Sequence, residues 1–402
     1  MVLPLDGIKV VELGIWVAGP TCARVLGELG ADVIKIENPR GGDPARGVVS
    51  AGAEKDSVNP LWELYNGSKR SIAIDLTQAA GKEIVYKLVK ASDVLVTNMR
   101  PGALERLALD YETVAKINPR IIYAQNTGFG IKGPDRDRPA FDSNGFWIRS
   151  GIMSTLGQPD SPPVPLRGAM GDLPTALFLV AAIGMAILAR EKLGVGQKID
   201  ISLMSSGMWV AAEDIQQRLI WGERADNQKH SREKVSNPLW NIYRTKDKWF
   251  ELILLETERF WPPFCKAIER EDLEKDPRFD TDQKRAKNNE LLISIIDEVL
   301  ATRTMKEWGE RFDQYGLVWA AETPIAEVLA DPQVSQNGFI AEVQPPSDNS
   351  FKLLRIPFQF SKTPIQPRKV APKLGQHTEE VLLELGYDRT QLSRLKGQGV
   401  IV

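Results

Sequence analysis

Short β-branched runs alternate with stretches of helical spacing in the first third of the chain, and this alternation constrains the fold more than any other sequence feature. We predict strands at residues 8–13, 32–37, 71–75, 93–97 and 120–126, with helices at 20–29, 78–91 and 112–116 between them. Strands that alternate with helices form a mainly parallel sheet covered on both faces. Because such open sheets bind ligands beyond the carboxyl ends of their strands, we expect a ligand site at that edge.

The chain changes character after about residue 220. Residues 237–255 predict a hairpin that turns at 246–248, and helices are expected at 259–268 and 289–301. This mixture is typical of a separate, smaller α+β domain. The helical stretch 202–220 is expected to connect it to the first domain.

The overall composition is that of a soluble globular protein with a sizeable core, at 402 residues, 43% hydrophobic and 26% charged. A net charge of −2 argues against a nucleic-acid binder that relies on bulk charge. No secretory signal is predicted at the N-terminus. The two cysteines, Cys22 and Cys265, lie far apart and form no disulfide framework, which fits a reducing cytoplasm.

The most apolar stretch follows an aspartate, in GDLPTALFLVAAIGMAILA at 171–189. A bilayer needs about 20 apolar residues, and this run is shorter and has Pro174 near its start. We therefore predict a buried helix and no membrane association. Asp172 has two interpretations that the residues alone leave open. It caps the helix, or it is a functional carboxylate that small neighbours leave accessible to a substrate.

Several common site motifs are missing from the sequence. The turn ELGIWVAGPTCARVLGELG lacks the G-x-G-x-x-G of dinucleotide-binding domains, and neither a phosphate-binding P-loop nor a G-x-S-x-G elbow occurs. His230 and His377 stand alone, so no metal site and no tightly bound cofactor are predicted. Basic residues near predicted strand ends or loops are individually typical of solvated surface but together suit a phosphorylated ligand: Arg40, Lys69, Arg70, Arg100, Arg106, Arg136 and Arg138.

The whole chain resembles the class III CoA-transferase family. The resemblance lies in PLDGIKVVELGIWVAGP, LGADVIKIENPRGGDPAR, SKRSIAIDL, NMRPGALERL, NPRIIYAQNTGFG, GDLPTALFLVAAIGMAILAREKLGVGQKIDISLM and LGQHTEEVLLELGY, which occur in this order. It implies a Rossmann-like large domain built from both chain ends, a smaller domain between them, and a homodimer of interlocked rings. The expected boundaries are 1–200 and 326–402 for the large domain, 201–224 for a helical linker and 225–325 for the small domain. A hetero-oligomer with a related subunit is left open.

The resemblance also implies a mechanism. CoA moves from an acyl-CoA donor to a small carboxylic acid, and the family's nucleophile corresponds to Asp172, which forms a mixed anhydride with the acyl group. Coenzyme A is then a substrate rather than a cofactor. The implied CoA contacts are Val17, Ala18, Asn38, Arg40, Ile74, Asp75, Thr77, Asn98, Met99, Arg106 and Arg138. Asn38 and Thr77 depart from the arginine and lysine common in the family, so the phosphate partners are open.

The main rival is the α-methylacyl-CoA racemase branch, which pairs a histidine with an aspartate to move a proton. The racemase histidine falls on Phe141 here, which cannot take a proton. Asp142 matches an acidic transferase position, with a loop-capping role as the alternative. Four tryptophans are candidates to line an acyl pocket or to be core residues: Trp16, Trp240, Trp249 and Trp261. We expect a bulky or aromatic carboxylate as substrate, with succinyl-CoA as the candidate donor.

Overall fold

The computed structural model describes residues 2–48, 58–225, 229–344, 350–367 and 369–402. The chain divides into two compact units, which we describe separately. The first comprises residues 1–153, 165–226 and 337–402, and the second comprises 154–164 and 227–336. The stretch expected as a linker, 201–224, falls within the first unit.

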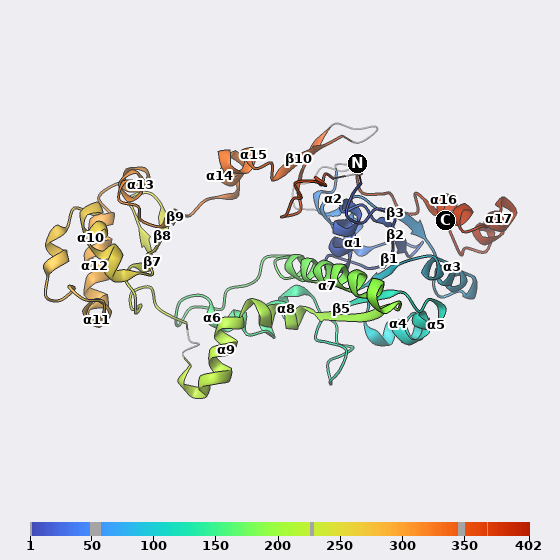
Figure 1. Cartoon of the computed structure of the whole chain (residues 1–402), viewed down its shortest axis with the longest axis horizontal. Helices are drawn as coiled ribbons and strands as arrows, with labels where there is room; N and C mark the ends of the chain where they lie inside the picture. Colours follow the sequence, from blue (N-terminus) through green and yellow to red (C-terminus); the bar gives the residue numbers. More distant parts are fainter. Residues whose placement is uncertain (1, 49–57, 226–228, 345–349, 368) are drawn as a thin grey trace. The chain divides into compact units, whose positions relative to one another are not determined.

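A six-stranded parallel sheet forms the centre of the first unit (Figure 1). Its strands are β1 (Lys9–Leu13), β2 (Asp32–Glu37), β3 (Arg70–Ala73), β4 (Val94–Thr97), β5 (Ile122–Thr127) and β6 (Gln197–Ser202), in the order β3-β2-β1-β4-β5-β6. The five predicted strands are confirmed, and β6 is an addition. This order reverses between β1 and β4, and in doubly wound sheets the crevice beyond that point binds ligands.

Helices cover both faces of the sheet. One face packs against α1 (Ala18–Glu28) and α7 (Asp172–Leu193). The other packs against α3 (Ala79–Lys90), α5 (Tyr111–Ile117), α16 (Thr378–Glu384) and α17 (Arg389–Gly397). An antiparallel bridge joins Ile74, just past β3, to Ile401. The N-terminal and C-terminal parts of the chain thus share one core.

Helix α7 is longer than predicted and is not buried on all sides. Thr175, Leu179, Ile183 and other residues of one face are buried, but only 28% of its most apolar 18-residue window is buried. By length and composition alone this helix is long and apolar enough to span a membrane, as core helices of soluble proteins also are. The face that carries Met185 and Leu188 is exposed in the single chain, so the prediction of a buried helix is confirmed only for the face packed on the sheet.

The stretch predicted as one connecting helix is two helices, α8 (Leu203–Val210) and α9 (Ala212–Trp221), which break at Ala211. Ser202 starts α8 with a capping box to Ser205. Further elements of this unit are α2 (Pro60–Asn66), α4 (Pro101–Leu107), a π-helical segment η2 (Ser143–Ile148), and the antiparallel pair β10 (Ile340–Val343) and β11 (Phe351–Leu354). The short helix α6 (Ile152–Thr155) spans the boundary between the units.

The second unit is an α+β structure with its own aromatic core. Its antiparallel sheet contains β7 (Trp240–Arg244), β8 (Trp249–Ile253) and β9 (Trp319–Ala321), so the predicted hairpin is confirmed. Its helices are α10 (Thr257–Ala267), α11 (Asp282–Lys287), α12 (Asn289–Leu300), α13 (Met305–Gln314), α14 (Ile325–Ala330) and α15 (Pro332–Gln336). Trp261 is a core residue here and packs against Phe264, while Trp240 is exposed and Trp249 half-buried.

Candidate active site

The turn between β1 and α1 lies where the strand order reverses, and hydrogen bonds fix several of its residues. Thr97 Oγ1 donates to Leu13 O at 2.9 Å. The Asn98 side chain bonds both backbone groups of Ile15: Ile15 N donates to Oδ1 at 2.9 Å and Nδ2 donates to Ile15 O at 2.7 Å. Trp16 N donates to Asp43 Oδ1 at 3.0 Å. These bonds give the turn one conformation at the entrance to helix α1.

Two adjacent cavities open on this turn and share Ile15 and Met99 in their walls. The first, of about 250 Å³, lies beyond the ends of β1, β2 and β3. Its lining includes five of the residues predicted to contact CoA: Asn38, Ile74, Asp75, Thr77 and Met99. Hydrogen bonds from Thr77 and Gln78 keep the pKa of the Asp75 carboxyl below its ordinary value, so this wall carries a negative charge.

The second cavity, of about 310 Å³, contains the candidate nucleophile. Asp172 lines it, together with the predicted residues Val17, Ala18, Asn98 and Met99. Trp16 and Phe141 also line it, in an edge-to-face pair with ring centroids 5.7 Å apart. Arg100 and Asn126 add polar groups to this wall, so the cavity combines a carboxylate and a cation with apolar and aromatic surface that suits an acyl group.

Asp172 is not the cap of helix α7. The helix begins at Asp172 itself, Gly171 holds the cap position, and no side-chain capping bond forms there. The Asp172 side chain accepts no hydrogen bond from the residues that the structure describes. Burial, and then the nearby charge of Asp142, raise the pKa of the Asp172 carboxyl from 3.8 to about 7. A poorly solvated carboxylate with a raised pKa is a stronger nucleophile than an exposed one.

Asp142 reaches Asp172 because Gly171 has no side chain. A Cβ at Gly171 would lie 2.6 Å from Cγ of Phe146 in the segment η2, so only glycine lets η2 pack against the start of α7. Asp142, the residue before η2, is buried and accepts a long hydrogen bond of 3.4 Å from Gly171 N. Two carboxylates thereby stand at one helix start, and the charge of Asp142 adds to the effect of burial, which is the larger cause of the raised Asp172 pKa.

The three arginines predicted to bind CoA are exposed and line neither cavity. Arg40 lies 3.6 Å from Asp75 at the edge of the first cavity. Arg106 sits on α4, whose Leu107 lines the first cavity and whose Ala103 lines the second. Arg138 precedes Pro139 and Ala140 of the second cavity. Each has the reach of a long side chain toward an anionic ligand, and their role in binding stays a prediction.

Three other basic residues suggested for a phosphorylated ligand are already engaged. Lys69 is buried and directs its Nζ at Pro20 O (2.8 Å), Asn66 Oδ1 (2.9 Å) and Glu12 Oε2 (2.7 Å). Arg70 pairs with Asp32, Glu380 and Glu384. Arg136 pairs with Glu105 and Asp137. The suggestion is wrong for Lys69 and Arg70, because a cation whose donors are paired inside the protein has little left for a ligand, whereas for Arg136, whose side chain is 38% exposed, it stays a prediction.

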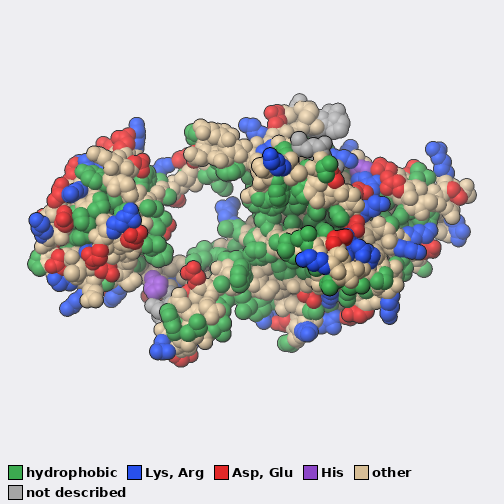
Figure 2. All heavy atoms as spheres, in the orientation of Figure 1, with side chains coloured by type: hydrophobic (Ala, Val, Ile, Leu, Met, Phe, Trp, Pro, Cys, Tyr) green, Lys and Arg blue, Asp and Glu red, His purple; other side chains and the backbone are tan. Residues whose placement is uncertain are grey.

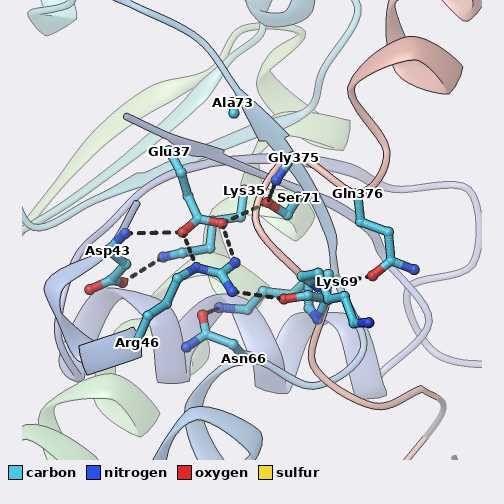
Figure 3. A network of polar contacts seen from close by, with 12 residues as sticks. Lys35, Glu37, Asp43, Arg46, Asn66, Lys69, Ser71, Ala73, Gly375 and Gln376 are labelled. Atoms are coloured by element: carbon cyan, nitrogen blue, oxygen red, sulfur yellow. Dashed lines mark hydrogen bonds and ion pairs between the residues drawn. The ribbon is translucent and has the colours of Figure 1, made fainter. Parts of the chain in front are cut away.

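A buried polar network beneath the turn was missed from the sequence (Figure 3). Lys35 on β2 stands opposite Glu12 on β1, and Asp43 follows β2. Lys35 Nζ donates to Glu12 Oε1 at 2.8 Å, Asp43 Oδ2 at 2.9 Å and Gly14 O at 2.7 Å. The available signal was the charge of Glu12 and Lys35 inside otherwise apolar strands, since buried charges are rare unless paired.

Rossmann strand order and two ligand-sized cavities at its switch point, one of them lined by a carboxylate, define an α/β protein with a ligand site at the carboxyl edge of its sheet. Residues 5–378 match the model of CoA-transferase family III. The chain is 32% identical to (R)-2-hydroxy-4-methylpentanoate CoA-transferase of Clostridioides difficile, over 99% of both chains. It is 31% identical to cinnamoyl-CoA:phenyllactate CoA-transferase of Clostridium sporogenes, over 97% of this chain and 95% of the relative.

A crystal structure of a CaiB/BaiF family protein from Brucella suis has the same fold, with a TM-score of 0.82 and 30% identity. The similarity covers 96% of this chain and 100% of that one. The chain belongs to CoA-transferase family III and is an enzyme. The family resemblance and the mixed α/β fold around a parallel sheet, both predicted from the sequence, are confirmed.

Proposed function

We propose that this enzyme transfers CoA between an acyl-CoA and a bulky, apolar carboxylic acid, with Asp172 as the nucleophile. The observation that carries the proposal is the position of Asp172, whose carboxylate lines an aromatic cavity without a hydrogen-bond donor among the described residues. A carboxylate in this environment has no structural bond to lose when it attacks. Its raised pKa makes it basic enough to react with a thioester carbonyl.

The reaction proceeds by four acyl exchanges that need no oxidant and no net proton. Asp172 attacks the donor thioester, the C–S bond breaks, and CoA thiolate leaves a mixed anhydride. The thiolate attacks the aspartyl carbonyl and releases the donor acid, giving an aspartyl-CoA thioester. The acceptor carboxylate attacks this thioester, the C–S bond breaks, and CoA thiolate leaves a second mixed anhydride. The thiolate then attacks the acceptor carbonyl of this anhydride, which forms the new CoA thioester and releases the Asp172 carboxylate. Because water would hydrolyse the anhydride, an apolar cavity wall favours transfer.

We propose that the CoA moiety lies across the two cavities. We place its nucleotide end in the first cavity and its thioester in the second, since the two share the wall formed by Ile15 and Met99. Arg40, Arg106 and Arg138 are the candidate phosphate partners, because guanidinium groups pair well with phosphate. Asn38, Ile74, Asp75 and Thr77 then contact the nucleotide, and Val17, Ala18 and Asn98 the pantetheine arm.

The lining of the second cavity supports a bulky, apolar acid as substrate. Trp16, Phe141 and Leu203 offer broad apolar surface, which suits a branched or aromatic acyl chain. Two relatives whose names include 2-hydroxy-4-methylpentanoate and phenyllactate act on acids of this size. Succinyl-CoA stays the candidate donor, and Arg100, which lines the same cavity, is the cation that its second carboxylate would meet.

The racemase alternative gains no support from the site. Phe141 stands at the position of the racemase histidine, at the second cavity, and offers no proton. His377 lies elsewhere, where its Nδ1 accepts from Ser71 N at 3.2 Å, and His230 belongs to the second unit. Proton transfer at the α-carbon would therefore lack one of its two groups.

We also propose a homodimer, in the interlocked form that the sequence resemblance implies. Its support is the apolar surface that the first unit exposes on α7, α8 and α9 (Figure 2). The exposed side chains are Met185, Leu188, Leu193, Met208, Trp209, Val210, Leu219, Ile220 and Trp221. Large exposed apolar surfaces mark sites of protein or membrane interaction, and we propose that a second copy of the chain covers the outer face of α7. The expected location of the protein in the cytoplasm agrees with an apolar face covered by protein.

The test is trapping of the aspartyl intermediate. The protein is mixed in turn with 3-phenylpropanoyl-CoA, 4-methylpentanoyl-CoA and succinyl-CoA, quenched with hydroxylamine, and digested for peptide mass spectrometry. We expect a hydroxamate on the Asp172 peptide that is absent from Asp172→Ala. Exchange of a ¹³C-labelled acid into its own CoA thioester gives a second readout without knowledge of the natural acceptor. Label exchange with an unmodified Asp172 peptide overturns the assignment of the nucleophile.

A further inference from the structure

Trp16 adopts a backbone conformation that tryptophan rarely takes. Its φ is 66°, in the left-handed region that costs a residue with a side chain roughly 1–2 kcal/mol. Such outliers persist where the surrounding structure holds them, and they gather at functional sites. The conformation places the Trp16 ring in the wall of the second cavity, against Phe141.

Asp43 supplies the bond that holds this conformation. Its Oδ1 accepts from Trp16 N at 3.0 Å and from Ala45 N at 3.0 Å, while its Oδ2 accepts from Lys35 Nζ at 2.9 Å. Both oxygens thus face only donors. An asparagine has a single acceptor oxygen, so at this position it turns an amide N–H toward either Lys35 or the two backbone N–H groups.

The Asp43 carboxylate is itself fixed by its neighbours (Figure 3). Lys35 is fully buried; burial opposes its charge, but Glu12, Asp43 and Glu37 outweigh burial and raise the pKa of the ammonium. Glu37 Oε2 accepts from Asp43 N at 3.0 Å and from Arg46 Nε at 2.8 Å. Hydrogen bonds to its backbone N–H and to its carboxylate therefore fix the position of Asp43. Asp43 lines the first cavity and bonds Trp16, which lines the second.

Trp16 and Phe141 face the cavity that holds Asp172, so their rings bound the space beside the nucleophile. Phe141 is 58% exposed, and its ring packs edge to face with the Trp16 ring. The Trp16 ring offers apolar contact area that only a large acyl chain uses fully. A small acyl group leaves most of this area unfilled.

We propose that Trp16 determines acyl-group specificity and that Asp43 is the positioning residue that keeps Trp16 in its left-handed conformation. The proposal rests on the transferase function described above. It predicts that the preference for large over small acyl groups depends on the Trp16 ring and that Asp43 influences this preference through Trp16. Neither residue forms or breaks a bond in the reaction.

The experiment compares the wild type, Trp16→Gly, Asp43→Asn and the double variant. Glycine accepts φ of 66° without strain, so Trp16→Gly removes the ring and leaves the turn undisturbed. The readout is kcat/KM for exchange of ¹³C-labelled acid into 3-phenylpropanoyl-CoA and into acetyl-CoA. We expect Trp16→Gly to lower the ratio of kcat/KM for 3-phenylpropanoyl-CoA to kcat/KM for acetyl-CoA by about tenfold or more, chiefly by raising KM for the large substrate. A tenfold change corresponds to about 1.4 kcal/mol. We expect Asp43→Asn to lower this ratio as well.

The double variant separates positioning from general damage. If Asp43 acts through Trp16, Asp43→Asn changes the ratio little once the ring is gone, as a double-mutant cycle requires for coupled residues. Asp110→Asn is the matched control, because Asp110 also accepts from a backbone N–H and a hydroxyl, of Thr113, away from both cavities. An unchanged ratio in Trp16→Gly, with active wild type, overturns this proposal alone. No exchange by the wild type with either substrate, and no Asp172 adduct, overturns the transferase function instead.

Discussion

Asn98 and Ile15 form a two-bond pair across the switch point of the sheet, with Ile15 N donating to Asn98 Oδ1 at 2.9 Å and Asn98 Nδ2 donating to Ile15 O at 2.7 Å. The side chain thereby substitutes for a strand partner at the point where β1 and β4 diverge. Asn98 was predicted as a CoA contact, and the structure gives its amide a second role in shaping the wall between the two cavities. Ligand binding and turn geometry are thus linked at this residue.

Replacing Asn98 with alanine tests that link. Two hydrogen bonds are lost and a backbone N–H and C=O are left unpaired, so we expect a loss of about 1–3 kcal/mol in stability and a rise in KM for acyl-CoA. Denaturant unfolding and steady-state kinetics measure the two effects. Asn118→Ala is the control, since Asn118 Nδ2 also donates to two backbone carbonyls, of Val89 and Ser92, but outside the cavities. Equal KM changes in both variants would contradict the prediction.

The pH dependence of the reaction follows from Asp172. Its ionised form is the nucleophile, so kcat/KM should rise with pH and level off above about 7, the value to which burial and Asp142 raise the Asp172 pKa. Asp142→Asn keeps an oxygen acceptor for Gly171 N but removes the neighbouring charge. We expect the midpoint of the profile to move to lower pH, while remaining above the ordinary aspartate value because burial is the larger cause. Asp200→Asn, an exposed acid on β6, should leave the midpoint in place.

The same shift makes Asp172 a cost to stability at neutral and alkaline pH. The folded protein binds the Asp172 proton more tightly than the unfolded chain, so stability from this group falls as pH rises from about 3.8 to about 7 and stays low above it. Asp172→Asn should therefore raise the free energy of unfolding at pH 8 by up to about 4 kcal/mol, at about 1.4 kcal/mol per pKa unit. The gain should shrink at pH 5. Denaturant titrations of both proteins at the two pH values measure this, and a gain that is equal at both argues against the raised pKa.

Arg106 is the phosphate partner whose test is most direct. It is exposed on α4 between residues that line the two cavities. We expect Arg106→Ala to raise KM for acyl-CoA by about tenfold, as loss of one charge-assisted phosphate contact would, and to leave KM for the acid unchanged. Repeating the measurement with the thioester of dephospho-CoA identifies the phosphate, because a contact to the 3′-phosphate has no effect on that substrate. Arg389→Ala on α17 is the matched surface control.

The exposed face of α7 predicts the assembly state. Met185→Glu combined with Leu188→Glu places two charges on this face without touching the side packed on the sheet. We expect the variant to sediment as a monomer and to lose label exchange, whereas the wild type sediments as a dimer. Leu383→Glu, an exposed leucine on α16, should leave the assembly unchanged. A monomeric wild type would contradict the homodimer.

Local pattern alone predicted five of the six strands and the helices α1, α3 and α5, but not β6, α16 or α17, because β-branched alternation and helical spacing are properties of neighbouring residues. It also singled out Asp172, through its small neighbours and the apolar run after it, and left open whether that residue was a cap. Only the tertiary structure decided that question. Gly171 holds the cap position, Asp142 lies beside Asp172 across Gly171, and no described residue donates a hydrogen bond to Asp172.

The same division applies to the charged residues. Lys69 and Arg106 are both basic residues near predicted strand ends or loops. Lys69 is buried and hydrogen-bonded inside the protein, whereas Arg106 is exposed beside the cavities. Whether such a side chain is buried depends on how the strands and helices pack together. Here that packing involves the ion pairs of Glu12 with Lys35 and Lys69 and the hydrogen bond from Trp16 N to Asp43. Burial and charge pairing are set by residues far apart in the chain, and for that reason no local pattern predicts them.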